Sequence, residues 1–98
     1  MNRYILSNKA EEDIADIYEY SANTHSDIQA EAYLVALHEA LSMLAESPNL
    51  GTSAEDIRAN YFQFPVQKHM VFYKKINDNI LVVRVLHQQI KYAMHFSN

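Results

Sequence analysis

Residues 69–87 read HMVFYKKINDNILVVRVLH, and this stretch decides the fold. Two apolar runs, Met70–Tyr73 and Ile80–Leu86, flank the polar tripeptide Asn77-Asp78-Asn79. Val, Ile, Phe and Tyr suit a pleated, half-buried surface, whereas Asn and Asp tolerate the left-handed backbone of a tight reversal. The stretch therefore predicts a β-hairpin. Both faces of its second strand are apolar, so we expect that strand to be central and covered on both sides.

The length of the hairpin loop sets the relation between two histidines at its open end. A three-residue loop places His69 directly opposite His87, whereas a two-residue loop turns them to opposite faces. The sequence does not distinguish between the two loop lengths. A facing pair is either a metal-binding or catalytic pair, or two partly buried structural histidines, and the structural role is the commoner one.

The beginning of the chain predicts a short strand and a helix. Arg3–Leu6 is the strand candidate, and Ser7 or Asn8 then caps a helix over residues 9–22. One stripe of this helix is suited to burial, and it consists of Ala10, Ile14, Ile17, Tyr18 and Ser21.

Ser26, with Gln29 three residues later, opens a second helix that extends to about Glu46. Because the connection is short, the two helices should form an antiparallel hairpin. The main apolar stripe has helical spacing and comprises Ala30, Tyr33, Leu34, Leu37, Leu41 and Leu44. A second, weaker stripe comprises Ile28, Ala32, Val35, Ala36, Ala40 and Met43. This is more apolar surface than one sheet face covers, so either the first helix or a partner takes the surplus.

Ile57–Phe64 predicts a third strand, and Pro65 after it fits a sheet edge or a strand end. The tail, residues 88–98, fits a short helix, a last strand or a mobile segment equally well. The predicted order is β-α-α-β-β-β plus the tail, in one domain over residues 1–98. The fold class is α+β, with an antiparallel sheet packed against the N-terminal helical hairpin.

The amino-acid composition limits both the cellular compartment and the kinds of chemistry that we expect. The 98 residues contain no cysteine, which removes disulfides and thiolate metal sites together. The longest apolar run, AYLVAL, is too short to cross a bilayer, and the acidic N-terminus is unlike a signal peptide. We therefore expect a cytoplasmic protein without membrane contact. A single glycine excludes Gly-rich nucleotide loops, and the five histidines lack metal-ligand spacing, so we expect no cofactor and no metal.

The net charge of −4 conceals a strong asymmetry along the chain. Residues 1–56 carry eleven acidic and two basic side chains, a formal charge of −9, whereas residues 57–98 carry six basic and one acidic, a formal charge of +5. The asymmetry predicts a bipolar surface. The opposite charges either attract each other within the fold and help to hold it together, or they provide a basic surface that binds an acidic partner.

Arg84 lies among Ile80, Val82 and Leu86, an unusual place for a guanidinium. It either pairs with a helix carboxylate, for which Asp13 is a candidate, or faces a carboxylate or phosphate ligand.

Several pieces of the chain together resemble the ParE branch of the RelE/ParE toxin superfamily of bacterial toxin–antitoxin modules. They are YILSNKAEEDIADIYEY, AEAYLVALHEALSMLAESPNLG, DIRANYFQF, HMVFYKK and ILVVRVLHQQ, and they follow the family's order over residues 4–89. One departure is Lys91, where many relatives carry an acid. The resemblance implies a RelE-like α+β fold and a toxin that inhibits DNA gyrase, through its A subunit, by trapping the DNA-cleavage complex.

The resemblance also implies a ParD-like antitoxin that wraps the toxin, and leaves room for a higher-order toxin–antitoxin assembly. An amphipathic segment laid into an apolar groove would use both the basic half and the surplus helical stripe. We therefore expect antitoxin contacts at Arg58, Tyr73, Lys74, Lys75, Arg84, Ala36 and Met43. We expect gyrase contacts at His87, Lys91 and Tyr92, with no catalytic residue and no direct contact with nucleic acid.

Two other functions remain as alternatives. The first is ribosome-dependent mRNA cleavage, the other activity of the superfamily. This reaction needs a general acid, a general base and cations, and the candidates for these roles are Arg84, His87, Tyr92 and Lys68. An RNase working inside the ribosome should be strongly basic, and this chain is not. The other alternative is an interaction module without toxicity.

Overall fold

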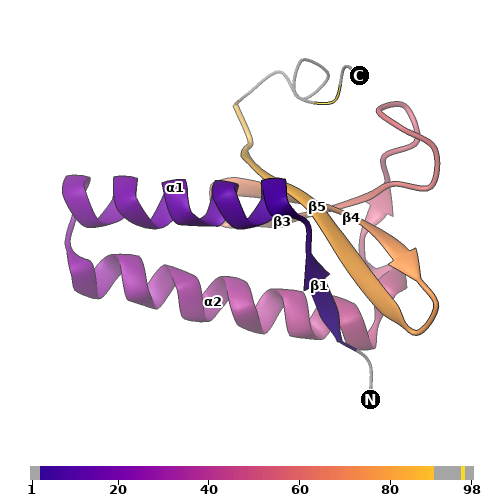
Figure 1. Cartoon of the computed structure of the whole chain (residues 1–98), viewed down its shortest axis with the longest axis horizontal. Helices are drawn as coiled ribbons and strands as arrows, with labels where there is room; N and C mark the ends of the chain where they lie inside the picture. Colours follow the sequence, from indigo (N-terminus) through magenta and orange to yellow (C-terminus); the bar gives the residue numbers. More distant parts are fainter. Residues whose placement is uncertain (1–2, 90–95, 97–98) are drawn as a thin grey trace.

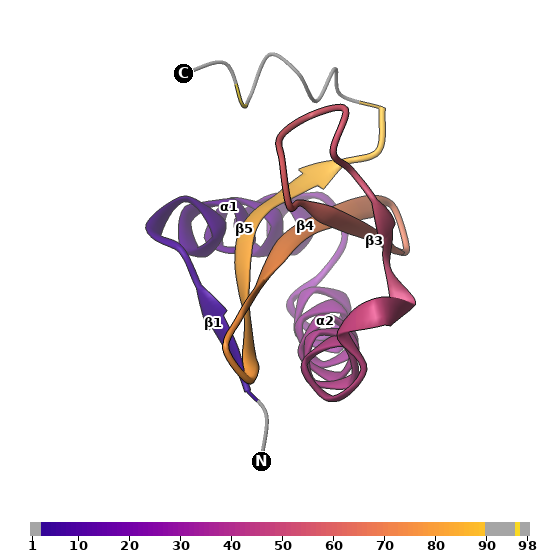
Figure 2. The same ribbon diagram turned by 90° about the vertical axis from the view of Figure 1, so that its right-hand side faces the viewer.

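Two antiparallel helices cover one face of a five-stranded sheet in the computed structural model, which describes residues 3–89 and 96 (Figures 1 and 2). The elements are β1 (Tyr4–Leu6), α1 (Asn8–Thr24), α2 (Asp27–Glu46), the 3-10 turn η1 (Pro48–Leu50), β2 (Thr52–Ser53), β3 (Phe62–Val66), β4 (His69–Ile76) and β5 (Asn79–His87). The strand order is β1-β5-β4-β3-β2. The α+β class and the helical hairpin are confirmed. The sheet is mixed, however, because β1 pairs with β5 in parallel.

Both helices begin at the serines that the sequence favours as caps. The Ser7 side chain accepts a hydrogen bond from the Ala10 N–H, and that of Ser26 accepts one from the Gln29 N–H. Each bond satisfies a backbone donor that a helix start leaves unpaired. Of the two caps considered for α1, Ser7 is therefore the one used.

The β4–β5 hairpin combines a two-residue turn with a facing histidine pair. Ile76 pairs with Asn79, and Asn77 in the turn has a φ of 53°. The register shifts between Phe72 and Tyr73, which pair with Arg84 and Val82 respectively, so one residue of β5 is extra. Such a β-bulge moves every later residue of its strand by one position. His69 therefore pairs with His87 despite the short turn, and our inference that a two-residue loop separates them was wrong.

The bulge also redirects the side chains of β5. Ile80 and Val82 lie in the cluster beneath the helices, and so does Val85, three residues after Val82. Leu86 lies instead in the cluster on the opposite face. Strict alternation along this strand, which we assumed from the sequence, thus fails at the bulge. β5 is an interior strand covered on both faces, but β4 occupies the middle of the sheet.

The third predicted strand starts later than expected. Residues 57–61 form turns, with Asn60 at a φ of 69°, and β3 contains Pro65. Pro65 is tolerated because β2 pairs only with Phe62 and Gln63, which leaves the outer edge of β3 unpaired at the proline. The two-residue β2 was not predicted.

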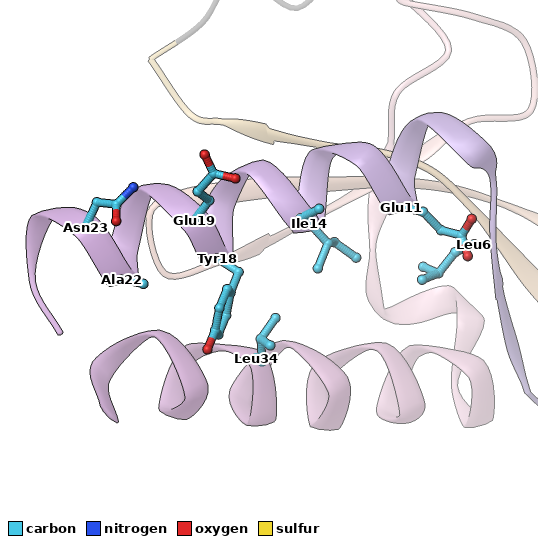
Figure 3. A pocket seen from close by; sticks show the side chains of 9 residues that line it. Leu6, Glu11, Ile14, Tyr18, Glu19, Ala22, Asn23 and Leu34 are labelled. Atoms are coloured by element: carbon cyan, nitrogen blue, oxygen red, sulfur yellow. The ribbon is translucent and has the colours of Figure 1, made fainter. Parts of the chain in front are cut away.

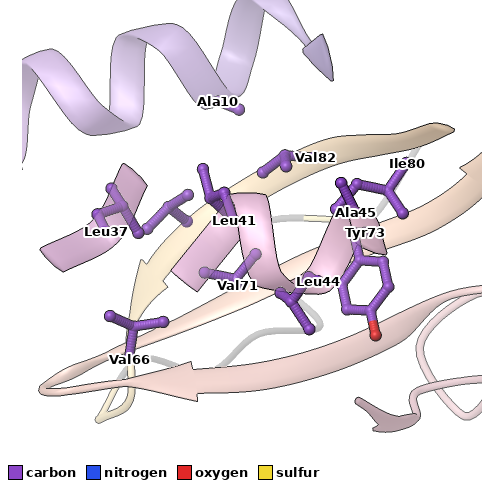
Figure 4. Close-up of a cluster of buried hydrophobic side chains, with 11 residues drawn as sticks. Ala10, Leu37, Leu41, Leu44, Ala45, Val66, Val71, Tyr73, Ile80 and Val82 are labelled. Carbon is purple, nitrogen blue, oxygen red and sulfur yellow. The ribbon is translucent and has the colours of Figure 1, made fainter. Parts of the chain in front are cut away.

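The main core lies between the helices and the sheet (Figure 4). Leu37, Leu41 and Leu44 of α2 are at most 2% exposed and meet Val71 and Tyr73 of β4. This confirms the main stripe. A smaller cluster of Ala54, Phe72 and Leu86 lies on the other face of the sheet, called here the helix-free face, where Ile57, Tyr61 and Phe96 pack against it.

Candidate interaction surfaces

Arg84 is held by a carboxylate of α1. Its Nε lies 2.8 Å from Asp13 Oδ2 and its Nη2 lies 2.9 Å from Oδ1, so the guanidinium fork meets the carboxylate in a bidentate pair. The hydrogen bond to Asp13 raises the pKa of Arg84. The candidate partner named from the sequence is thus the one used. Two of the guanidinium nitrogens of Arg84, a predicted antitoxin contact, are thus already engaged within the fold.

The same carboxylate closes part of a sheet edge. β1 pairs with β5 only as far as Val82, which leaves the following backbone groups of β5 without a strand partner on that side. Ser7 Oγ donates to the Val83 carbonyl at 2.9 Å, and the Val85 N–H donates to Asp13 Oδ2 at 3.0 Å. Asp13 therefore replaces a strand at this edge while it neutralises Arg84.

The histidine pair lies in a groove of about 900 Å³ between the helices and the ends of β4 and β5. The His69 and His87 rings meet edge to face, with centroids 5.4 Å apart. His69 Nδ1 lies 2.8 Å from the Tyr33 hydroxyl, which joins the pair to α2. Burial, followed by the neighbouring His87 and Lys68, lowers the pKa of His69, and burial raises the pKa of Tyr33 to about 12.

The lowered pKa of His69 and the raised pKa of Tyr33 both favour the neutral form of these two side chains, because burial disfavours the charged form. Asp13 and Asp16 line the same groove together with Lys68 and Arg84, so the groove carries side chains of both charges. Within residues 3–89 and 96, no group of three or more His, Asp or Glu side chains is placed to hold a metal ion. Structural histidines are the interpretation that fits this geometry.

The basic residues predicted to bind the antitoxin do not form one patch. Lys74 shares the side of Met70 and Phe72 on β4 and therefore faces the helix-free side. Arg58 is exposed there too, and its guanidinium donates to the Phe96 carbonyl. Lys75 points the other way, since it contacts the Asn49 side chain and lies 4.9 Å above the Phe62 ring.

Tyr73 is not at the surface. It is 0% exposed, and its hydroxyl donates to the Pro48 carbonyl at 2.7 Å and accepts from the Gly51 N–H at 3.0 Å. A Cβ on Gly51 would lie 2.3 Å from that hydroxyl, which explains the chain's single glycine at this position. The prediction of Tyr73 as an antitoxin contact is corrected, because its place in a strand pattern could not reveal the turn that covers it.

The remaining predicted contacts divide between α2 and the end of β5. On α2, Met43 is 43% exposed, whereas Ala36 is half-buried between Tyr33 and Ala40, which pack against the core. His87 is half-buried in the groove, while Lys91 and Tyr92 lie outside the described residues.

A second groove was missed from the sequence. It has a volume of about 500 Å³ and lies along the seam between α1 and α2, where Tyr18 points toward Leu34 (Figure 3). Ile14 adds apolar surface, and Glu11 and Glu19 also line it. Ile14 and Tyr18 belong to the stripe of α1 that we expected to be buried, and Leu34 belongs to the main stripe of α2. Only the spacing of the two helices shows that the edges of these stripes remain accessible.

Comparison with known proteins identifies the family. A family profile described as the ParE toxin of the type II toxin–antitoxin system parDE matches residues 4–92. The chain belongs to the ParE toxin family. Toxin ParE1 of Caulobacter vibrioides is 35% identical over 95 residues, covering 97% of this chain and 98% of that protein. Toxin ParE1 of Mycobacterium tuberculosis strain H37Rv is 32% identical over 90 residues, covering 91% and 92% of the two chains.

A solved structure shares the fold of this chain. A chain of the structure titled "Chromosomal ParDE TA system from P. aeruginosa" superposes with a TM-score of 0.75, covering 89% of this chain and 95% of that one at 15% identity. Among the described residues, no helix is long and apolar enough to cross a membrane. The ParE match spans β1 to the end of β5, so it includes both grooves and every residue predicted to touch a partner.

Proposed function

We propose that this ParE-family protein arrests growth by inhibiting DNA gyrase in the cytoplasm, and that a ParD-like antitoxin neutralises it. The observation that carries the proposal is the family match over residues 4–92, together with ParE1 relatives that align along nearly their whole length. The toxin would bind the gyrase A subunit and hold the DNA-cleavage complex, without a cofactor and without catalysis of its own.

The distribution of the predicted contacts supports an antitoxin that wraps the toxin. Arg58 and Lys74 are available on the helix-free side, whereas Ala36 and Met43 lie on α2 across the molecule. One short helix cannot reach both sides, but an extended segment can. Lys75 is a further candidate at the rim, and a higher-order assembly with the antitoxin is compatible with this arrangement.

Gyrase contacts are proposed at the other end of the sheet. His87 lies at the end of β5, and Lys91 and Tyr92 follow it in the sequence. A site there would be separate from Lys74, which lies near the hairpin turn. The antitoxin would then neutralise the toxin by wrapping it or by burying the end of β5.

The proposal is tested with purified gyrase and supercoiled plasmid. We expect the toxin to cause linear DNA with covalently attached gyrase to accumulate, and equimolar antitoxin to suppress it. His87→Ala should lower this cleavage, whereas Ser53→Ala, on the exposed β2 strand, should leave it unchanged. Growth arrest without DNA breaks would refute the proposed target.

Ribosome-dependent RNA cleavage is the competing activity, and we expect none. The groove that holds His69 and His87 also contains two carboxylates, and Arg84, a cation that cleavage would need, is paired with Asp13. Toeprinting of ribosome-bound message with the purified toxin measures this directly. Cuts that disappear in His87→Ala would reverse the assignment.

A further inference from the structure

The outer face of α2 carries apolar side chains that the fold does not cover. We define this face by Ile28, Ala32, Val35 and Met43, on the side opposite the buried leucines. The first three follow one another at helical spacing, and Glu39 lies between Val35 and Met43 on the same face. Ile28 is 82% exposed, Val35 is 57% exposed and Ala32 is exposed as well. Three large apolar side chains aligned on one helix face are unusual for a surface that meets only water.

The first helix does not take up this surplus. α1 approaches α2 on the side of Leu34, where the smaller groove runs between them (Figure 3). Neither buried cluster includes any of the four residues of the outer face. Of the two possibilities left open by the sequence, a partner is therefore the one that the structure favours.

The charges around the outer face determine what kind of partner fits. α2 carries Asp27, Glu31, Glu39 and Glu46, all exposed, and contains no Lys or Arg. Glu11 and Glu19 of α1 add further negative charge beside the smaller groove. A second copy of this chain, packed α2 against α2, would bring these carboxylates against one another and is disfavoured.

We propose that the outer face of α2 binds an amphipathic helix of the antitoxin in which Lys or Arg residues flank the apolar seam. This deepens the proposed function and rests on it. Ile28 and Met43 are separated by about 22 Å along the helix at 1.5 Å per residue, so the partner helix needs about four turns with apolar residues at i, i+3 or i+4, and i+7.

It follows that the antitoxin segregates its own charges. The segment that reaches Arg58 and Lys74 on the helix-free side has to be acidic, whereas the helix on α2 has to be basic. A uniformly acidic antitoxin would be attracted to one side of the toxin and repelled from the other. The bipolar surface thereby also sets the direction in which the antitoxin wraps.

The first test removes the apolar contacts. Val35→Ser and Ile28→Ser should each weaken binding of the full-length antitoxin from the neighbouring reading frame by about tenfold, as buried interface anchors do. Leu50→Ser is the matched control, because Leu50 is 50% exposed but lies on η1. Val35→Ala, with circular dichroism and melting of every variant, separates lost binding from lost folding.

The second test reverses the charges. Glu31→Lys combined with Glu39→Lys should slow association with the antitoxin, and Glu55→Lys, outside the helices, should not. Replacing the basic residues of the antitoxin helix by Glu should weaken binding to the wild-type toxin, and the Glu31→Lys/Glu39→Lys toxin should restore it. Such rescue requires that the two charge sets face each other.

Three outcomes would overturn the inference while the proposed function stands. Unchanged antitoxin affinity in all outer-face variants would show that the antitoxin binds elsewhere. Loss of gyrase inhibition at unchanged antitoxin affinity would assign the face to the target. A wild-type dimer in light scattering that Val35→Ser dissociates would assign it to a second copy. Wild-type toxin that binds no antitoxin at all would instead refute the proposed function itself.

Discussion

At the scale of single residues, Asp13 has two roles, of which the sequence suggested only the pairing with Arg84. It neutralises Arg84 and accepts the Val85 N–H, and the two charged side chains are only 12% and 16% exposed respectively. Removing one partner of such a pair leaves the other charge poorly solvated. The arrangement is thus a structural joint between α1 and β5.

We expect Asp13→Ala to lower the free energy of unfolding by about 2–3 kcal/mol, somewhat less than for a fully buried pair, because water still reaches both groups. Adding Arg84→Met should recover part of this loss, because the unpaired cation is removed. Urea unfolding of the two single variants and the double variant measures the coupling. Additive effects would mean that the pair contributes no net stabilisation.

His69 makes the stability depend on pH. Because its folded pKa lies below the ordinary value of 6.5, the unfolded chain takes up the proton first as the pH falls. The His69 contribution is therefore complete above about pH 6.5 and declines below it, toward the folded pKa. Urea unfolding between pH 5 and 8 should show this slope, His69→Gln should flatten it, and a slope that persists in His69→Gln would assign it to other groups.

At the scale of the elements, α2 and β5 each serve two surfaces. β5 does so through its bulge, which sends Val85 to the helix side and Leu86 to the helix-free side. α2 does so through its two stripes, since the leucines of the first are buried in the core, whereas Ile28, Val35 and Met43 of the second are exposed. Stability and the proposed recognition of the antitoxin therefore depend on different residues of the same helix.

This division predicts opposite outcomes for two alanine substitutions on α2. Leu41→Ala, at a side chain that is 1% exposed, should cost about 2–5 kcal/mol through lost burial and a cavity. Val35→Ala should leave stability within about 0.5 kcal/mol of the wild type, since an exposed valine gains little from folding. Thermal melting of both variants is sufficient, and equal losses would show that the two faces are not distinct.

At the scale of the whole molecule, charge is sorted by layer. The helical layer is acidic, while most of the basic residues belong to the sheet and its loops. Such sorting accelerates the encounter with a partner of matching charge pattern and makes that encounter sensitive to salt.

Lys74→Glu should slow association with the antitoxin about three- to tenfold and flatten its salt dependence, with a smaller effect on dissociation. Lys9→Glu, on the exposed start of α1 in the acidic layer, is the control and should not slow association. Stopped-flow mixing at two salt concentrations provides the measurement. If neither variant changes the rate, the asymmetry serves only the cohesion of the fold.

The sequence alone determined the elements whose signals are local. The hairpin, both helices, the Ser26 cap and the main leucine stripe were predicted, because periodicity and capping act over a few residues. Ser7 and the Asp13–Arg84 pair were each one of two alternatives that the sequence left open. The ordered family motifs added the toxin assignment, which the family match confirms.

Tertiary structure decided what depends on contacts between distant segments. The bulge in β5 lies where β1, Ser7 and Asp13 bind that strand's other edge, and these contacts with distant segments cannot be predicted from the length of the hairpin loop. Tyr73 was placed at the surface because the turn that buries it lies more than twenty residues earlier. Likewise, only the packing of α2 in the fold could show that Ile28, Val35 and Met43 of its second stripe stay exposed while Ala40 packs against the core. An amphipathic pattern records which side chains are apolar but not which of them find a partner.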